Sequence, residues 1–202
     1  MNCLFYALNM VRSVPVWLIV KSLDLSDIIE QDMYGYRYAV DSEHRLKGLL
    51  LFNRVTASRK MFRNVIVFRI KKKSKKLAYV AGLILPQKAD LELCQGEIAG
   101  GLTIYHGHAT VVVCEKAGKN LTLYQGVTIG KNSKEGESKV MPTIGNDVTV
   151  YTNAVVAGGI KIGNNVDIGA GAVVMKDVPD NTMVIGNPCY FKTKDYGKEN
   201  GR

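Results

Sequence analysis

The chain has 202 residues, 47% of them hydrophobic, and a formal net charge of +9. This length supports one main unit with a small accessory part. No recognition motif or aromatic–basic interleaving accompanies the charge, so nucleic acid is not an expected partner. No apolar stretch approaches the roughly 20 residues that span a bilayer. The four cysteines lack metal-ligand spacing, as expected for reduced thiols of a cytoplasmic protein without a metal.

Residues 1–88 predict a small helical region. The first 23 residues are apolar but are interrupted by Asn9, Arg12 and Pro15. They also lack the basic start and small-residue cleavage site of a signal peptide, so we expect a core-packing or interfacial helix. Further along, apolar residues recur at three- and four-residue spacings, which favour helices.

A basic segment, residues 59–76, lies within the helical region. It carries nine lysines and arginines and no acid, which equals the whole formal excess of +9. One interpretation is a surface for anionic lipid headgroups or for a phosphate-bearing acceptor at the inner face of the membrane. The other is an ordinary solvated helix end and loop, since most charge runs have no specific partner.

Between residues 144 and 178 the sequence repeats every six residues. This period fits neither a 3.6-residue helix nor a two-residue strand alternation. It is typical of a coil with flat faces and tight corners, in which Gly and Asn supply the positive φ of each corner. The expected inward residues are Ile144, Val150, Val156, Ile162, Ile168 and Val174, each followed four places later by Val148, Ala154, Ile160, Val166, Ala172 and Val178.

The period continues upstream in weaker form and gives the expected domain organisation. We predict a left-handed parallel β-helix of hexapeptide repeats over residues 89–188, mainly β, preceded by the helical region and followed by a tail, 189–202. Residues 130–142 are largely polar and interrupt the six-residue period, so we expect a loop that protrudes from one corner of the coil.

Two histidines stand where the repeat begins, in Tyr105-His106-Gly107-His108. Counted from Ile104, His106 falls at an outward corner and His108 at an inward position. A metal site lacks a third ligand at a suitable spacing. His106 is therefore the candidate general base, and a carboxylate is needed to orient it. The acids that precede it by about one turn of the coil are Asp90 and Glu92.

Several motifs resemble a known family. The phrases GLTIYHGHATVVV, LYQGVTIGK and IGAGAVVMKDVPDNTMVIGNP are similar to those of left-handed β-helix acyltransferases, in the serine acetyltransferase branch and its capsular polysaccharide O-acetyltransferase relatives. The resemblance covers residues 90–188, about half of the chain. It implies a homotrimer, acetyl-CoA as cosubstrate in the groove between neighbouring coils, and no metal.

The resemblance also implies roles for individual residues. His106 matches the catalytic histidine. The position of the family's aspartate partner, counted back from His106 without gaps, is Leu91. A shift of one residue would place either Glu92, which we choose, or Asp90 at that position. The implied cofactor-binding residues are Asn132, Thr152, Ala170 with its neighbour Gly171, and Lys176, although a solvated lysine is an equally good interpretation of the last.

The acceptor site departs from the serine enzymes. Those enzymes hold the carboxylate of serine with an Arg-His pair, for which this chain has Val140 and Met141. Tyr105 beside the base suits stacking on a sugar ring. We therefore expect Tyr105, His108 and Met141 to bind a sugar hydroxyl of a capsular or exopolysaccharide unit. The alternatives are a serine O-acetyltransferase of cysteine biosynthesis and a catalytically silent scaffold.

Overall fold

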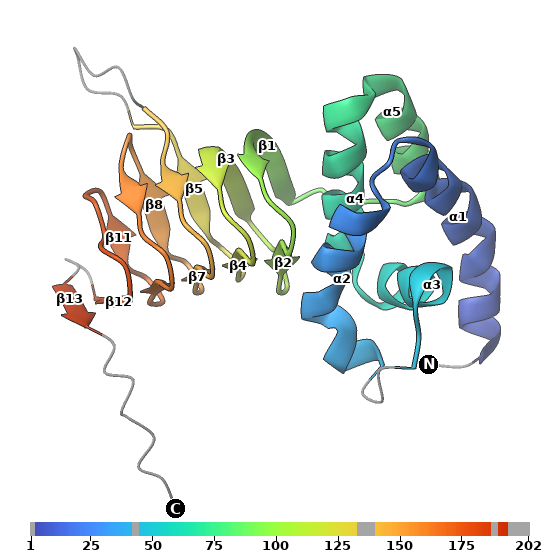
Figure 1. Cartoon of the computed structure of the whole chain (residues 1–202), viewed down its shortest axis with the longest axis horizontal. Coiled ribbons are helices and arrows are strands. Elements are labelled where there is room, and N and C mark those ends of the chain that lie inside the picture. The colour runs from blue at the N-terminus through green and yellow to red at the C-terminus, as the bar shows by residue number, and fades with distance from the viewer. Residues whose placement is uncertain (1–2, 42–44, 133–139, 187–189, 194–202) are drawn as a thin grey trace, which may run out of the picture.

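A computed structural model describes residues 3–41, 45–132, 140–186 and 190–193. Helices form one end of the molecule and a coil of short parallel strands forms the other (Figure 1). The helices in the described residues are α1 (Cys3–Ser22), α2 (Ser26–Val40), α3 (Gly48–Ser58), α4 (Lys60–Lys73) and α5 (Lys75–Ile84). The first strand begins at Leu91, so the change from helix to strand falls between Ile84 and Leu91.

The strands stack along the coil in three faces. The first face holds β5 (Thr128–Gly130), β8 (Val155–Ala157) and β11 (Val173–Val174); the second holds β6 (Thr143–Ile144) and β9 (Lys161–Ile162). The third holds β2 (Thr103–Ile104), β4 (Thr122–Leu123), β7 (Thr149–Val150), β10 (Asp167–Ile168) and β12 (Thr182–Ile185), with β13 (Tyr190–Thr193) antiparallel at its end. The long strands β1 (Leu91–Ile98) and β3 (Thr110–Ala117) pair in parallel, and β3 contributes to the first two faces.

The six-residue period produces this coil, so the predicted fold is confirmed. The expected inward residues are at most 3% exposed, apart from the partly buried Ile160. Asparagine and aspartate with positive φ turn the corners at Asn120, Asp147, Asn153, Asn165 and Asn181. These residue types tolerate the left-handed conformation, which explains their recurrence between the apolar positions.

The helical part is fastened to the first rung of the coil by buried polar contacts. Arg69 of α4 binds Asp32 of α2 through two parallel hydrogen bonds of 2.9 and 3.0 Å. The same Asp32 carboxylate accepts hydrogen bonds from the backbone N–H groups of Gly101 and Leu102. Tyr36 Oη accepts a hydrogen bond from Ile104 N at 2.6 Å. The contacts of Asp32 and Tyr36 with Gly101, Leu102 and Ile104 satisfy backbone N–H groups at the edge of the coil.

The basic segment divides into a buried and an exposed half. Arg63 and Arg69 are 6% and 4% exposed and bind backbone carbonyls in the interior. The lysines at the end of α4 and the start of α5 are exposed, namely Lys71, Lys72, Lys73, Lys75 and Lys76. The nine charges therefore do not form one continuous surface.

Helix α1 is longer and more apolar than the sequence led us to expect. Residues Leu4–Ser22 meet the length and hydropathy of a membrane-crossing helix, so the expectation that no stretch approaches this limit is wrong. Pro15 lies inside the helix. The inner face of α1 packs on α3, where Asn9 Nδ2 donates to Asn53 Oδ1 at 2.9 Å.

Candidate active site at a widened corner

One corner of the coil contains two more residues than its neighbour. Ile104 pairs with Leu123, and Val112 pairs with Ile129. The first rung therefore uses eight residues between these points where the next rung uses six. The added length lies in residues 105–109, and the corner bulges outward there.

The widened corner places both histidines in solvent. His106, Gly107 and Ala109 have positive φ values of 62°, 64° and 48°. Thr110 is fully buried and occupies the inward place predicted for His108, whose side chain is 66% exposed. The predicted inward position of His108 is therefore wrong, because the two added residues shift the period.

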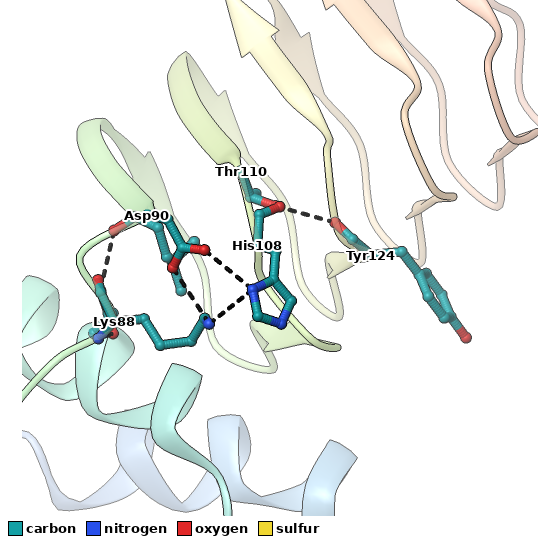
Figure 2. Close-up of polar contacts among 7 residues, drawn as sticks. Lys88, Asp90, His108, Thr110 and Tyr124 are labelled. Carbon is teal, nitrogen blue, oxygen red and sulfur yellow. Dashed lines mark hydrogen bonds and ion pairs between the residues drawn. The ribbon is translucent and has the colours of Figure 1, made fainter.

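Figure 2 shows the polar network that this corner holds. His108 Nδ1 lies 3.1 Å from Asp90 Oδ2 and 3.1 Å from Lys88 Nζ. Lys88 Nζ is also 3.3 Å from Asp90 Oδ1. Backbone contacts brace the corner, since the His108 carbonyl accepts from Gly126 N at 2.7 Å and from Thr110 Oγ1 at 3.1 Å. An imidazole whose Nδ1 is held by a carboxylate leaves Nε2 for an external hydroxyl.

Asp90 is the acid of this network. Desolvation acts to raise the pKa of Asp90, but hydrogen bonds from His108 and Lys88 outweigh it and hold that pKa below its usual value. The carboxylate is therefore charged at neutral pH, and its pairing is lost only as the pH falls through the lowered pKa. The sequence analysis did not identify Lys88 as a site residue. Its position two residues before Asp90 was the only signal for this role.

Glu92, our first choice of partner, lies elsewhere. Its Oε2 is 3.6 Å from Cys94 Sγ, and the structure gives it no contact with either histidine of the corner. A register irregularity in β1 surrounds Gly96, which has a φ of 142°. Its two register shifts cancel, because Leu91 pairs with Thr110 and Ile98 pairs with Ala117 at the same offset. The contact of His108 with Asp90, and not a shift within β1, therefore selects Asp90 over Glu92.

His106 is exposed, and within the described part of the chain its ring has no hydrogen-bond partner. Its positive φ is unusual, because the other non-glycine residues in this conformation are Asn, Asp and Ala109. Holding a residue other than Gly, Asn or Asp in this region costs about 1–2 kcal/mol, and such strain concentrates at functional sites.

A stack of tyrosine rings runs along the coil from the residue before His106. The ring centroids of Tyr105 and Tyr124 are 5.2 Å apart, and those of Tyr124 and Tyr151 are also 5.2 Å apart. Tyr105 further donates to the Gly35 carbonyl at 3.1 Å and packs near Tyr36. Tyr105 therefore joins the helices to the coil, which accounts for its ring without a bound sugar.

The residues implied for CoA binding flank the face of β5, β8 and β11. Thr152, Ala170 and Gly171 precede this face on the same corner column as the histidines, and Gly171 N donates to Thr152 O at 2.9 Å. Asn132 and Lys176 follow the face on its other side. Lys176 Nζ lies 4.7 Å from the centre of the Phe191 ring, a contact that gives this lysine a structural partner.

Met141 lies at the base of the predicted loop, of which residues 133–139 fall outside the described part. Asn132 N donates to Val140 O at 3.0 Å and closes the base. Met141 lines a cavity of about 470 Å³ together with the cations Lys72 and Lys116 and the acids Glu97 and Glu115. Among the described residues, no group of three or more His, Cys, Asp or Glu is placed to hold a metal.

The bacterial transferase hexapeptide (six repeats) family matches residues 141–176. Serine acetyltransferase of Bacillus pumilus is 47% identical over 87 residues, which are 42% of this chain and 39% of the relative. Serine acetyltransferase of Staphylococcus epidermidis is 37% identical over 131 residues, 61% of this chain and 60% of the relative. The chain thus spans less than two thirds of these relatives.

Solved serine acetyltransferases share the fold. The Neisseria gonorrhoeae enzyme in complex with serine aligns with a TM-score of 0.68 at 23% identity, over 96% of this chain and 85% of that one. The soybean apoenzyme aligns with a TM-score of 0.68 at 22% identity, over 95% and 85% of the two chains. The alignments include the helical part, so the likeness extends beyond the repeat.

These relatives correct the predicted acceptor. The expectation of a sugar hydroxyl in a polysaccharide rested on Val140, Met141 and Tyr105, and it is wrong: the relatives at 37–47% identity are serine acetyltransferases, which favours the alternative. The physical reason is visible in two places. Tyr105 has a structural partner, and lysines occur in the cavity beside Met141.

Proposed function

We propose that this protein is a serine O-acetyltransferase that uses acetyl-CoA. The observation that carries the proposal is the widened corner, which exposes two imidazoles, one of them paired with a charged Asp90, on the fold that solved serine acetyltransferases share. The proposal includes a homotrimer, as the family resemblance implies, with acetyl-CoA lying along the face flanked by Thr152 and Asn132. One solved neighbour with 22% identity is a serine acetyltransferase in complex with CoA.

In the proposed reaction, the His106 imidazole accepts the proton of the serine hydroxyl as its oxygen attacks the thioester carbonyl. The tetrahedral intermediate collapses with loss of the CoA thiolate, which recovers the proton from His106 and leaves O-acetylserine. The strained backbone of His106 supports this role. Asp90 and Lys88 add fixed charges next to the reacting groups.

His108 is a second candidate base, favoured by its hydrogen bond to Asp90. In this assignment Asp90 fixes the tautomer of His108 and leaves Nε2 to accept the serine proton. The two assignments predict different mutants. If His106 is the base, His106→Ala is inactive and Asp90→Ala is moderately impaired; if His108 is the base, His108→Ala and Asp90→Ala lose activity together.

The proposal is tested by measuring free thiol released from acetyl-CoA by the purified protein, with L-serine, D-serine, L-threonine or no acceptor. We expect release that depends on L-serine and an O-acetylserine product of the correct mass. No serine-dependent release, while CoA still binds, would contradict the acceptor assignment. The oligomeric mass from light scattering, read in the same preparation, tests the trimer.

The carboxylate of serine requires a cation that Val140 and Met141 do not supply. We propose that Lys116, which lines the cavity beside Met141, provides it from one copy in the trimer to a neighbouring site. Lys116→Ala should raise the KM for serine about tenfold or more with little change in kcat and in the KM for acetyl-CoA. Exposed Lys161, two rungs further along the same face, gives the matched control Lys161→Ala. Equal kinetics of the two variants would exclude Lys116.

A further inference from the structure

Helix α1 presents a continuous apolar face to solvent. Leu4, Leu8, Val11 and Leu18 are 68%, 64%, 76% and 60% exposed. Their spacings of four, three and seven residues place them on one side of the helix. No other described element covers this stripe, and α1 lies on the side of the helical part away from the coil (Figure 1). An apolar stripe of this length commonly marks an interaction surface.

The opposite face of α1 is fixed to α3 by polar side chains. Asn9 Nδ2 donates to Asn53 Oδ1 at 2.9 Å and to Ser13 Oγ at 3.0 Å, and Ser13 Oγ donates to Asn53 Oδ1 at 2.9 Å. Asn9 is 6% exposed and Ser13 is fully buried. A helix that crossed a bilayer would have to break this network and place Asn9 and Ser13 in hydrocarbon, at a cost of several kcal/mol per unsatisfied group. The network therefore favours a helix that lies on a surface over one that spans it.

Further apolar side chains lie on the helix next to α1, and lysines lie beside them. Helix α5 contacts α1 and exposes Tyr79 and Leu83, which are 71% and 67% exposed. Exposed Lys71 and Lys75 line one cavity together with Tyr79 and Leu83, whereas Lys72 and Lys73 face the coil, where they line a cavity with Glu97. Neither residues 3–22 nor residues 59–89 contain an aspartate or a glutamate.

This charge pattern distinguishes two partners for the exposed face of α1, a second copy of the chain and an anionic membrane. A second copy of the chain docked face to face would bring cations against cations, with no acid in either segment to pair with them. An anionic bilayer supplies both complements, headgroup charges for the lysines and an apolar boundary for the leucines. From the geometry we propose that α1, together with Lys71 and Lys75 beside Tyr79 and Leu83, forms a peripheral docking surface for an anionic membrane, with α1 lying flat and the histidine corner left free in solution.

The test is cosedimentation of the full chain with phosphatidylcholine vesicles, with and without phosphatidylglycerol, at low and high salt. We expect binding to the anionic vesicles only, weakened by salt. The double variants Leu8→Gln/Val11→Gln and Lys71→Gln/Lys75→Gln should each bind at least about tenfold more weakly. The matched control is Met175→Gln/Lys161→Gln, which changes an exposed methionine and an exposed lysine of the coil and should bind within about twofold of the parent.

Three results would overturn the proposal: absence of binding to anionic vesicles at low salt, equal binding by the α1 variant, or equal binding to neutral vesicles. Light scattering identifies the alternative occupant. A fall in mass for Leu8→Gln/Val11→Gln, combined with no vesicle binding, would show that this face joins copies of the chain. Circular dichroism establishes that the variants remain folded, which is expected because every substituted side chain is exposed.

Discussion

Replacing His106 by Asn should lower the rate of acetyl transfer to serine by about 10²–10⁴-fold without destabilising the fold. Asn lacks the imidazole that accepts the proton, but it tolerates the positive φ of 62° at this position better than His does. The free energy of unfolding should therefore be unchanged or higher by up to about 1 kcal/mol. Thiol release and urea unfolding of the same preparation measure the two effects.

His108→Asn is the matched control, because it makes the same change two residues away at a position without positive φ. This variant should lose the pairing with Asp90 and keep most of the activity. Its free energy of unfolding should not rise, because the backbone at this position is not strained. The reverse result, an inactive His108→Asn beside an active His106→Asn, would transfer the role of base to His108. Full activity in both would exclude this corner as the reaction site.

The regular part of the coil could be predicted from sequence because each rung repeats one physical requirement. An inward aliphatic residue packs on the rungs above and below it. Val150 therefore pairs with Ile168, and Val156 pairs with Val174, on successive rungs. Corner residues follow from the same geometry, since Asn153 and Asn165 have positive φ. A pattern that recurs every six residues constrains many positions together.

The irregular rungs could not be predicted, and they contain the candidate site. The two added residues at 105–109 leave no mark in the local sequence pattern. The six-residue count therefore assigned His108 to an inward position that Thr110 occupies. The added residues become visible only once the strands are paired, because register is a property of two segments rather than one.

The burial of charged side chains could not be predicted from the sequence either. Arg69 reads as one of nine cations in a basic run, yet it is 4% exposed and binds Asp32, 37 residues earlier in the chain. Local composition predicts solvent for such a residue, whereas tertiary contacts bury it. Of the exposed lysines that follow it, Lys71 and Lys75 belong to the smaller surface proposed for membranes.

Asp32→Ala should lower the free energy of unfolding by about 3–5 kcal/mol. The substitution leaves the Arg69 guanidinium buried without its counter-charge and removes the acceptor of the Gly101 and Leu102 N–H groups. Urea unfolding measures the loss. The control Glu30→Ala changes an exposed acid of the same helix and should stay within about 0.5 kcal/mol of the parent. A loss below about 1 kcal/mol would show that packing alone holds α2 and α4 to the coil.

The same substitution should affect association, because Asp32 and Tyr36 cover an open end of the coil. Among the described strands, β2 pairs with β4 alone and ends its sheet, and its Ile104 N–H is satisfied by Tyr36 Oη. Repeat folds need such a cover, since an uncovered strand edge pairs with other chains. Light scattering through the unfolding transition should therefore show earlier aggregation for Asp32→Ala than for Glu30→Ala. Equal aggregation would mean that the first rung stays covered by the remaining contacts of α2, and that the ion pair contributes stability without protecting the edge.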